Sequence, residues 1–254
     1  MRVNFTVVIP ARHASTRLPG KSLLEIAGKP LIQHVYESAF NSDAERIIVA
    51  TDDRRIKNIV EAFGGHALMT GAHHKSGTDR IAEAINQLNI DDETIIVNVQ
   101  GDEFGLPSAI INQLPGMMFA HPAVPMATLC ERITERRDLD NPNIVKVVFS
   151  KDHSAIYFSR SPIPWSDPTR TGAGAGFPSR PYRHIGIYGY RAGFLRIFTA
   201  LPHCPLEESE QLEQLRALYY GYEIYVEEAV AKCGIGVDTP EDLELARRMA
   251  EKNG

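Results

Sequence analysis

The sequence predicts an α/β fold with a mostly parallel central sheet and flanking helices. Short apolar segments alternate with amphipathic ones over the first hundred residues, which is the pattern of a sheet built from βα units. Polar and charged residues follow two of the apolar segments directly, and ligands of such sheets bind at the carboxyl ends of the strands. The chain of 254 residues is long enough for one large domain with a substantial core, so we expect a single domain spanning residues 1–254.

The first half contains four predicted strands and three helices. The strands are short, apolar and rich in β-branched residues, and they cover residues 5–9, 46–51, 67–69 and 94–99. The helices cover residues 30–40, 54–63 and 78–88. Pro30 suits the first turn of the first helix, Gly64 and Gly65 end the second, and the third has apolar residues at helical spacing.

The second half does not continue the regular alternation of strands and helices. Its predicted strands cover residues 126–130, 145–149, 155–158, 184–190 and 223–226, and loops rather than regular helices are expected between the first four. Residues 169–181 are rich in Gly and Pro and predict a mobile surface loop. Two helices are expected at residues 206–219 and 239–252, the second with Thr239 as N-cap and Pro240 in its first position.

Composition excludes several functional classes. The net charge of −5 argues against a general nucleic-acid binder. No apolar run reaches the roughly 18 residues that a membrane span needs, and no signal-peptide pattern is present, so we expect a cytoplasmic protein without membrane attachment. Cys130, Cys204 and Cys233 are scattered and odd in number, which fits reduced thiols and offers no zinc spacing.

Positive charge gathers on the loop after the first strand. Arg12, Arg17 and Lys21 lie within ten residues that also contain Pro19 and Gly20. Guanidinium and ammonium groups are usual partners of phosphate oxygens, and a Pro-Gly turn can present backbone N–H groups to an anion. The spacing matches neither the Walker nor the dinucleotide-binding glycine motif. A solvated basic loop without specific contacts is the alternative interpretation.

A second polar segment follows the strand predicted at residues 94–99. It reads "QGDE", and Asp102 within it is a candidate magnesium ligand, because Mg²⁺ takes one or two carboxylates and completes its shell with phosphate oxygens and water. The alternative is that Asp102 caps a turn. Since both polar segments end parallel strands, they should lie on one edge of the sheet, where cations would hold phosphates and the carboxylate would hold the bridging metal.

Eight motifs in this order resemble the 3-deoxy-manno-octulosonate (Kdo) cytidylyltransferase family. They are "IPARHASTRLPGK", "KSGTDR", "VNVQGDE", "NPNIVKVV", "YFSRSPIPW", "RHIGIYGYRAGFL", "LEQLRALYYG" and "GVDTPEDLE". The resemblance covers nearly the whole chain. It implies a GT-A-like nucleotidyltransferase fold, the reaction of CTP with Kdo to CMP-Kdo and pyrophosphate for lipopolysaccharide biosynthesis, Mg²⁺ as cofactor, and a homodimer.

The resemblance also implies site residues. Those for the nucleotide are Pro10, Ala11, Arg12, Arg17, Lys21, Ser76, Thr78, Arg80 and Gln100, and those for the metal are Asp102 and Asp238. Arg12, Lys21, Asp102 and Asp238 would form the catalytic set. From the residues alone, Arg80 with Asp79 indicates a helix N-terminus, and Asp238 indicates a turn before a helix. Asp102 and Asp238 lie 136 positions apart, so their meeting is a prediction about the fold.

For the sugar, the resemblance implies Gln100, Arg160, His184, Tyr188, Glu210, Glu213 and Gln214. Arg160 suits the sugar carboxylate through a bidentate pair. Glu210, Glu213 and Gln214 would share one face of the helix predicted at residues 206–219, where a solvated acidic face is the commoner case. A structural role is the alternative for His184. Residues 125–230 would form an embedded region that shapes the sugar pocket and supplies dimer surface.

Three features depart from the family pattern. Phe104-Gly105 stand where the family usually has Pro and an aliphatic residue, His13 replaces an expected aromatic residue, and the Gly-rich segment at residues 171–177 is unlike its counterpart. Other interpretations therefore stay open. They are a cytidylyltransferase for another acid, such as 8-amino-Kdo or a sialic acid, and a CTP-binding protein without catalysis.

Overall fold

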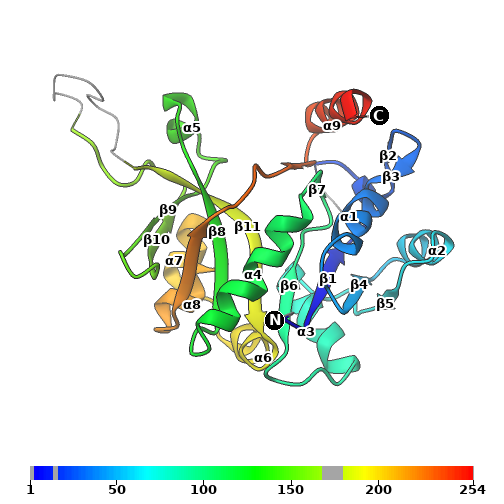
Figure 1. The fold of residues 1–254 in the computed structure, drawn as a ribbon, viewed down its shortest axis with the longest axis horizontal. Helices are drawn as coiled ribbons and strands as arrows, with labels where there is room; N and C mark the ends of the chain where they lie inside the picture. Colours follow the sequence, from blue (N-terminus) through cyan, green and yellow to red (C-terminus); the bar gives the residue numbers. More distant parts are fainter. Residues whose placement is uncertain (1–2, 14–16, 168–179, 254) are drawn as a thin grey trace.

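The central sheet of the computed structural model has two parts, which strand β11 (Tyr182–Arg191) joins. The structure describes residues 3–13, 17–167 and 180–253 (Figure 1), so most of the loop predicted at residues 169–181 lies outside the described residues. Within them, nine strands form one sheet in the order β10-β9-β11-β6-β1-β4-β5, and β8 and β12 branch from β11.

Four parallel strands form the first part and confirm the predicted βα pattern. They are β1 (Phe5–Ala11), β4 (Arg46–Thr51), β5 (Ala67–Met69) and β6 (Ile95–Asn98), and β1 lies between β4 and β6. Every residue of β1 is buried, which explains its almost continuous apolar sequence. Its carboxyl end delivers the chain to the basic loop.

Helices cover both faces of this sheet. One face packs against α1 (Leu31–Phe40), α2 (Arg54–Ala62) and α4 (Ser108–Ala120), and Leu243 and Ala246 of α9 (Pro240–Asn253) join the same core. The other face packs against α3 (Gly77–Gln87), α6 (Ala192–Ala200) and α8 (Leu215–Tyr219). Val7 and Ile9 of β1 contribute to the first core and Val8 to the second, as the alternation of side chains along a strand requires.

The second part of the sheet is mostly antiparallel. It comprises β8 (Met126–Arg132), β9 (Lys146–Phe149), β10 (Ala155–Ser159), β11 (Tyr182–Arg191) and β12 (Ile224–Glu228). Strand β11 runs antiparallel to β6, β8 and β9, so it joins the two parts. A short helix, α5 (Arg136–Asp140), lies between β8 and β9, where only loop was expected.

The prediction of one helix over residues 206–219 is wrong. The segment forms two short helices, α7 (Pro205–Glu210) and α8. Gln211 adopts a left-handed conformation with φ of 54° and ends α7. The apolar spacing suggested one helix because it continues past the break at Gln211, where Leu212 and Leu215 are buried. Glu210, Glu213 and Gln214 therefore do not share one helix face.

Helices α4 and α6 were not predicted from the sequence. Helix α4 contains Pro115 and Gly116, which read as helix breakers, and many of its apolar residues are buried. Its amphipathic period is therefore weak. Pro115, which has no backbone N–H to donate, nevertheless lies within the helix.

Short elements complete the structure around the carboxyl ends of the parallel strands. They are the 3-10 helix η1 (Lys21–Leu23) and strands β2 (Glu25–Ile26), β3 (Lys29–Pro30), β7 (Glu103–Phe104) and β13 (Ile235–Gly236). The chain passes from β12 through β13 into α9, which lies beside β2 (Figure 1). In the described part of the chain, no helix combines the length and apolarity that crossing a bilayer demands.

We expect Gly101→Ala to lower the free energy of unfolding by about 1–3 kcal/mol. A Cβ at residue 101 would lie 2.7 Å from the carbonyl oxygen of Pro10, so the turn after β6 would be pushed away from the end of β1. Urea denaturation measures the change. Gly116→Ala in α4 is the control, because a Cβ there meets nothing within 4 Å and alanine favours a helix. Equal stability of Gly101→Ala and the wild type would contradict the close approach.

Candidate functional site

The basic loop after β1 is closed by a turn at Gly20. Gly20 has a φ of 69°, a left-handed conformation that suits glycine, and its N–H donates to the carbonyl of His13 at 3.0 Å. The chain then enters η1 at Lys21. This turn directs the Lys21 side chain inward, where only 13% of it is exposed.

Asp102 and Asp238 are brought together by backbone pairing. The N–H of Val237 donates to the carbonyl of Asp102 at 2.9 Å, and β7 pairs antiparallel with β13 next to this bond. A side chain at Gly234 would have its Cβ 2.0 Å from the carbonyl oxygen of Phe104, so the pairing requires glycine there. Although 136 positions separate them, the two aspartates therefore lie in one site.

Lys21 lies between these two carboxylates. Its Nζ donates to Asp238 Oδ1 at 2.8 Å and forms a second ion pair with Asp102. Arg17 Nη2 donates to the other oxygen of Asp238 at 2.8 Å. Burial would lower the pKa of Lys21, but the charges and hydrogen bonds of Asp102 and Asp238 outweigh it and raise the pKa. A cation thus bridges two carboxylates at the edge of the sheet.

The N-terminus of α9 fixes the backbone at Asp238. Asp242 Oδ2 accepts from the N–H groups of Asp238 at 3.1 Å and Thr239 at 2.9 Å, and the N–H of Asp242 donates to Thr239 Oγ1 at 3.2 Å. These reciprocal bonds form a capping box and agree with the expected start of α9 at Thr239-Pro240. The cap leaves the Asp238 side chain directed toward Lys21 and Arg17.

A pocket of about 330 Å³ lies over this ion-pair cluster. Its walls come from the end of β1, the basic loop, the N-terminus of α3 and the turn after β6. Eight of the nine residues predicted for the nucleotide line it, namely Pro10, Ala11, Arg12, Arg17, Lys21, Ser76, Arg80 and Gln100. We refer to it as the smaller pocket.

The N-terminus of α3 forms one wall of the smaller pocket. Ser76 caps this helix, with its Oγ accepting from the N–H of Asp79 in a capping box. Arg80 is 2% exposed and pairs with Asp52 at 2.8 Å while donating to Thr70 Oγ1 at 2.6 Å. The interpretation of residues 79 and 80 as a helix N-terminus is therefore supported, and the Arg80 guanidinium also braces the pocket floor.

A larger pocket of about 1030 Å³ adjoins the smaller one. Arg17 and Asp238 line both pockets, so the cluster stands at their junction. Arg160 and His184, both predicted for the sugar, also line the larger pocket. The segment of residues 233–236 that leads toward α9 forms part of its wall.

Arg160 is held in place by backbone carbonyls. Its Nε donates to the carbonyl of Glu210 at 2.8 Å, and Nη1 donates to the carbonyl of Pro142 at 3.1 Å. The Glu210 carboxylate accepts from Ser159 Oγ at 2.6 Å and from the Arg160 N–H at 2.8 Å. Glu210 thus anchors the end of β10 and orients Arg160 beside the larger pocket.

Four other predicted residues lie in a buried polar cluster at the N-terminal end of α3. Thr78 donates its hydroxyl proton to the Glu213 carboxylate, and burial raises the pKa of Glu213. The same cause raises the pKa of Tyr188, with the charge of Glu213 adding to it. The Nε2 of the buried Gln214 has no partner among the described residues. Thr78, Tyr188, Glu213 and Gln214 are absent from the lining of both pockets described above.

His184 is held on β11 by Thr128. The Thr128 hydroxyl donates to the Ile187 carbonyl at 2.7 Å, so it accepts from the His184 Nε2–H at 2.9 Å. Burial lowers the pKa of His184 to about 3. The imidazole is therefore neutral at pH 7, and its Nδ1 can accept a hydrogen bond.

Sequence reasoning missed several residues of the site. His74 and Lys75 line the smaller pocket directly before the predicted Ser76, and His74 pairs with Glu83 of α3. Glu103 lines the larger pocket, and burial with the charge of Asp102 raises its pKa to about 7. The only sequence signal for these residues was their adjacency to a predicted one.

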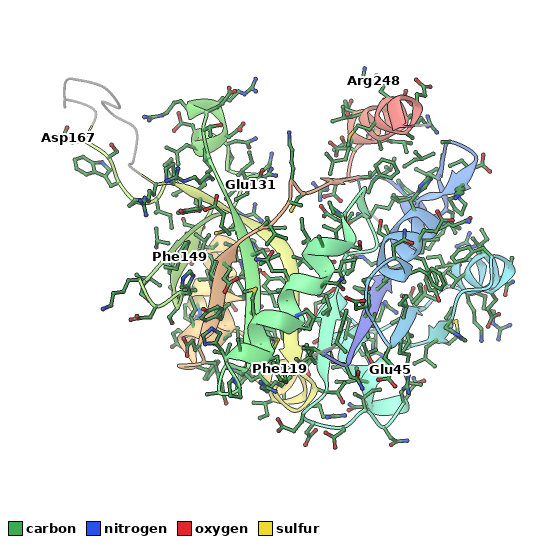
Figure 2. The ribbon with its side chains drawn as sticks, viewed as in Figure 1. Glu45, Phe119, Glu131, Phe149, Asp167 and Arg248 are labelled. Carbon is green, nitrogen blue, oxygen red and sulfur yellow. The ribbon has the colours of Figure 1, made fainter. Side chains whose placement is uncertain are left out.

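Another polar pair lies beside the larger pocket and was also missed. Glu131 on β8, labelled in Figure 2, accepts from Arg183 Nε at 2.9 Å. Arg183 on β11 and Glu131 on β8 are partners in the antiparallel pairing of these strands, so they lie opposite each other. The charge of Glu131 raises the pKa of Cys233, and that of Arg183 lowers it. Cys233 lies in the segment that leads to α9, so this pair borders the wall of the larger pocket.

The carboxylates of Asp102 and Asp238 fit a magnesium ion. They already share one cation, the Lys21 ammonium. Within the described ranges, no group of three or more His, Cys, Asp or Glu side chains is arranged to hold a metal. Two carboxylates suffice for Mg²⁺ when phosphate oxygens and water complete its shell, and the smaller pocket beside them is lined by cations that would hold phosphates.

Comparisons with known proteins agree on one group of relatives. A family model described as cytidylyltransferase matches residues 6–225. The 3-deoxy-manno-octulosonate cytidylyltransferase of Hahella chejuensis is 53% identical over 98% of each chain, and that of Pseudomonas syringae pv. syringae is 51% identical over 99% of this chain and 100% of its own.

Solved structures extend the comparison. A CMP:2-keto-3-deoxy-manno-octonic acid synthetase in complex with CTP superposes with a TM-score of 0.90, at 43% identity over 99% of both chains. A Bacillus anthracis protein described as a glucose-1-phosphate thymidylyltransferase superposes with a TM-score of 0.64 at 16% identity, over 97% of this chain and 95% of its own. The second likeness concerns the fold alone, and the two structures together confirm the expected nucleotidyltransferase fold.

We expect His184→Gln to flatten the pH dependence of unfolding below pH 6.5. The wild type loses stability as the pH falls from 6.5 toward 3, because the unfolded state then binds a proton that the folded state excludes. The slope from this one group is up to about 1.4 kcal/mol per pH unit. Urea titrations at pH 7, 6 and 5 measure it. His66→Gln, at an exposed position, is the control for removing an imidazole. An unchanged slope in His184→Gln would contradict the buried neutral state.

Proposed function

The chain belongs to the 3-deoxy-manno-octulosonate cytidylyltransferase family, and we propose that it converts CTP and Kdo into CMP-Kdo and pyrophosphate. The observation that carries this proposal is the Lys21, Asp102 and Asp238 cluster at the junction of two pockets. The smaller pocket would take CTP and the larger one Kdo, so that the reacting groups meet at the cluster. The product would serve lipopolysaccharide biosynthesis.

The reaction joins two anionic substrates. The anomeric hydroxyl of Kdo attacks the α-phosphorus of CTP, a new O–P bond forms, and the bond to pyrophosphate breaks in line. Arg12, Arg17 and Lys21 would bind the triphosphate and neutralise the leaving pyrophosphate. Ser76 and Gln100, with Pro10, Ala11, Thr78 and Arg80, would position the rest of the nucleotide. Holding both substrates in this geometry accounts for much of the expected acceleration.

Asp102 and Asp238 would hold Mg²⁺. When bound there, the ion would offset the repulsion between the two substrates and lower the pKa of the attacking hydroxyl. The existing ion pairs prepare both carboxylates for a cation, because their oxygens already converge on Lys21. Phosphate oxygens of CTP would attract the Lys21 ammonium toward the nucleotide.

Sugar recognition would fall to residues of the larger pocket and the buried polar cluster. Arg160 would bind the Kdo carboxylate, and the neutral His184 would accept a hydrogen bond from a sugar hydroxyl at Nδ1. Gln100, which lines the smaller pocket, and Tyr188, Glu210, Glu213 and Gln214, which line neither pocket, stay predictions for hydrogen bonds to the sugar hydroxyl groups. Glu210 already orients Arg160 through its carbonyl, so its contribution would include shaping the carboxylate site.

Activity with mutated aspartates tests the proposal. We expect pyrophosphate release from CTP, Kdo and Mg²⁺, and a rate loss of about a hundredfold or more in Asp102→Asn and Asp238→Asn, since each removes a charge that acts on the transition state. The exposed Asp152→Asn is the matched control. Normal turnover by either site variant would contradict its role.

Substrate panels identify the acid and the nucleotide in the same assay. Kdo should be used in preference to 8-amino-Kdo and sialic acid, and CTP in preference to UTP and GTP. Preference for another acid would keep the cytidylyltransferase reaction and change its substrate. Tight CTP binding without product from any of the acids would favour a binding protein without catalysis.

We also propose a cytoplasmic homodimer in which residues 125–230 supply sugar-binding and dimer surface. Ile156 on β10 and Trp165 are 62% and 78% exposed, and large apolar side chains are enriched at interfaces between subunits. A cytoplasmic location fits the use of CTP and the absence of disulfides among Cys130, Cys204 and Cys233.

Sedimentation velocity tests the dimer. The wild type should sediment as a species of twice the chain mass of 28.2 kDa. The double variant Ile156→Lys with Trp165→Lys should shift toward the monomer, because the dimer interface would bury unpaired lysines. Phe40→Lys, also at an exposed apolar position but on α1, is the control. A monomeric wild type would contradict the proposal.

A further inference from the structure

A lysine is fully buried beneath one wall of the larger pocket. Lys146 lies on β9 and has 0% exposure. Lysine is rarely fully buried without a partner that compensates its charge. In the parts of the chain that the structure describes, no carboxylate oxygen lies within 4 Å of its Nζ. This position therefore calls for an explanation beyond packing.

Three backbone carbonyls surround the Lys146 ammonium. Its Nζ donates to the carbonyls of Ile144 at 2.7 Å, Asn141 at 3.0 Å and Arg160 at 2.5 Å. An ammonium has three N–H donors whereas a neutral amine has two. Three acceptors therefore satisfy the charged form, although burial lowers the pKa of Lys146.

The carbonyls belong to two segments that line the larger pocket. Asn143, Ile144 and Val145 form one stretch of its wall, and Arg160 forms another. The Arg160 guanidinium returns to the first stretch by donating to the carbonyl of Pro142. The side chains of Lys146 and Arg160 thus both connect residues 141–144 with residue 160. Lys146 does so from beneath the wall, and Arg160 does so from its surface.

The three carbonyls need hydrogen-bond donors, but they do not need a net charge. Neutral N–H groups could serve them, and burying an ion is costly. In the low dielectric of the interior, however, a fixed positive charge acts over longer distances than at the surface. An anion bound at Arg160 would experience both charges. The carbonyls hold the ammonium in place without cancelling its net charge, and the carboxylates of Asp140 and Glu210 act on it from beyond ion-pair distance.

We propose that Lys146 is a positioning residue for the carboxylate of the acid sugar. It fixes the backbone of Arg160 and of residues 141–144, and its charge strengthens the attraction of the larger pocket for an anion. This inference rests on the proposed function, since it takes the acid sugar as the occupant of the larger pocket. It adds a residue that touches no substrate and acts through Arg160 and through its electric field.

The test compares an anionic ligand with a neutral ligand of nearly the same shape. They are 2-deoxy-Kdo, which lacks the attacking hydroxyl, and its carboxamide, and each is titrated calorimetrically into the protein with CTP and Mg²⁺. We expect Lys146→Met to weaken binding of the acid about tenfold or more, and that of the carboxamide by less than about threefold. The affinity for CTP should stay unchanged. Lys151→Met, at an exposed position, is the matched control.

Other outcomes have distinct meanings. Equal weakening for both ligands would overturn the electrostatic role and leave a structural one, and no weakening would overturn the inference altogether. Lys146→Arg, which keeps the charge, should retain the preference for the acid over the carboxamide. Failure of the wild type to bind 2-deoxy-Kdo, or to release pyrophosphate with Kdo, would instead count against the proposed function.

A measurement on the wild type covers the case in which the variants do not fold. With ¹⁵Nζ-labelled lysine, the buried ammonium should give a slowly exchanging NMR signal that moves when the acid binds and stays in place with the carboxamide. A signal whose position does not change when the acid binds, or that shifts equally with both ligands, would overturn the inference.

Discussion

The site depends on the meeting of two carboxylates across one ammonium. Like charges repel, so Asp102 and Asp238 can be neighbours only where a cation compensates them. Lys21 supplies it, and Arg17 adds a second contact to Asp238. The pairing of β7 with β13 and the bond from Val237 to Asp102 hold the backbones together. Electrostatic attraction and backbone pairing thus enforce the same arrangement.

The arrangement explains how one site can take two anionic molecules. Arg17 and Asp238 line both pockets, so a positive and a negative group stand at the boundary. The smaller pocket carries cations from the basic loop, whereas Arg160 and the buried Lys146 place positive charge beside the larger one. Each anion would therefore meet its own cations before the two approach each other.

Much of the fold could be predicted from the sequence because burial leaves a clear pattern there. The strands β1, β4, β5 and β6 are apolar on both faces, and their parallel direction follows from the helices between them. The break at Gln211 could not be predicted, since apolar spacing continues across it. Helix α4 was missed because Pro115 and Gly116 conceal a helix that is buried on much of its surface.

The site could be predicted only in part, because only some of its residues directly follow a strand that the sequence predicts. The basic loop and Asp102 follow strands, so elementary rules on sheet edges place them together. Asp238 depends on β13, a strand of two residues with no pattern of its own, and only family resemblance pointed to it. Lys146 was missed because a lysine within a strand normally faces solvent, and its burial is visible only once the carbonyls around it are known.

A double-mutant cycle on Asp102 and Asp238 tests the central claim most directly. Rates of pyrophosphate release are compared for the wild type, Asp102→Asn, Asp238→Asn and the double variant. If both carboxylates serve one shared cation, the double variant should be little slower than the worse single variant, because losing either ligand already removes the joint function. Losses that multiply in the double variant would show that the two aspartates act independently and would contradict the account.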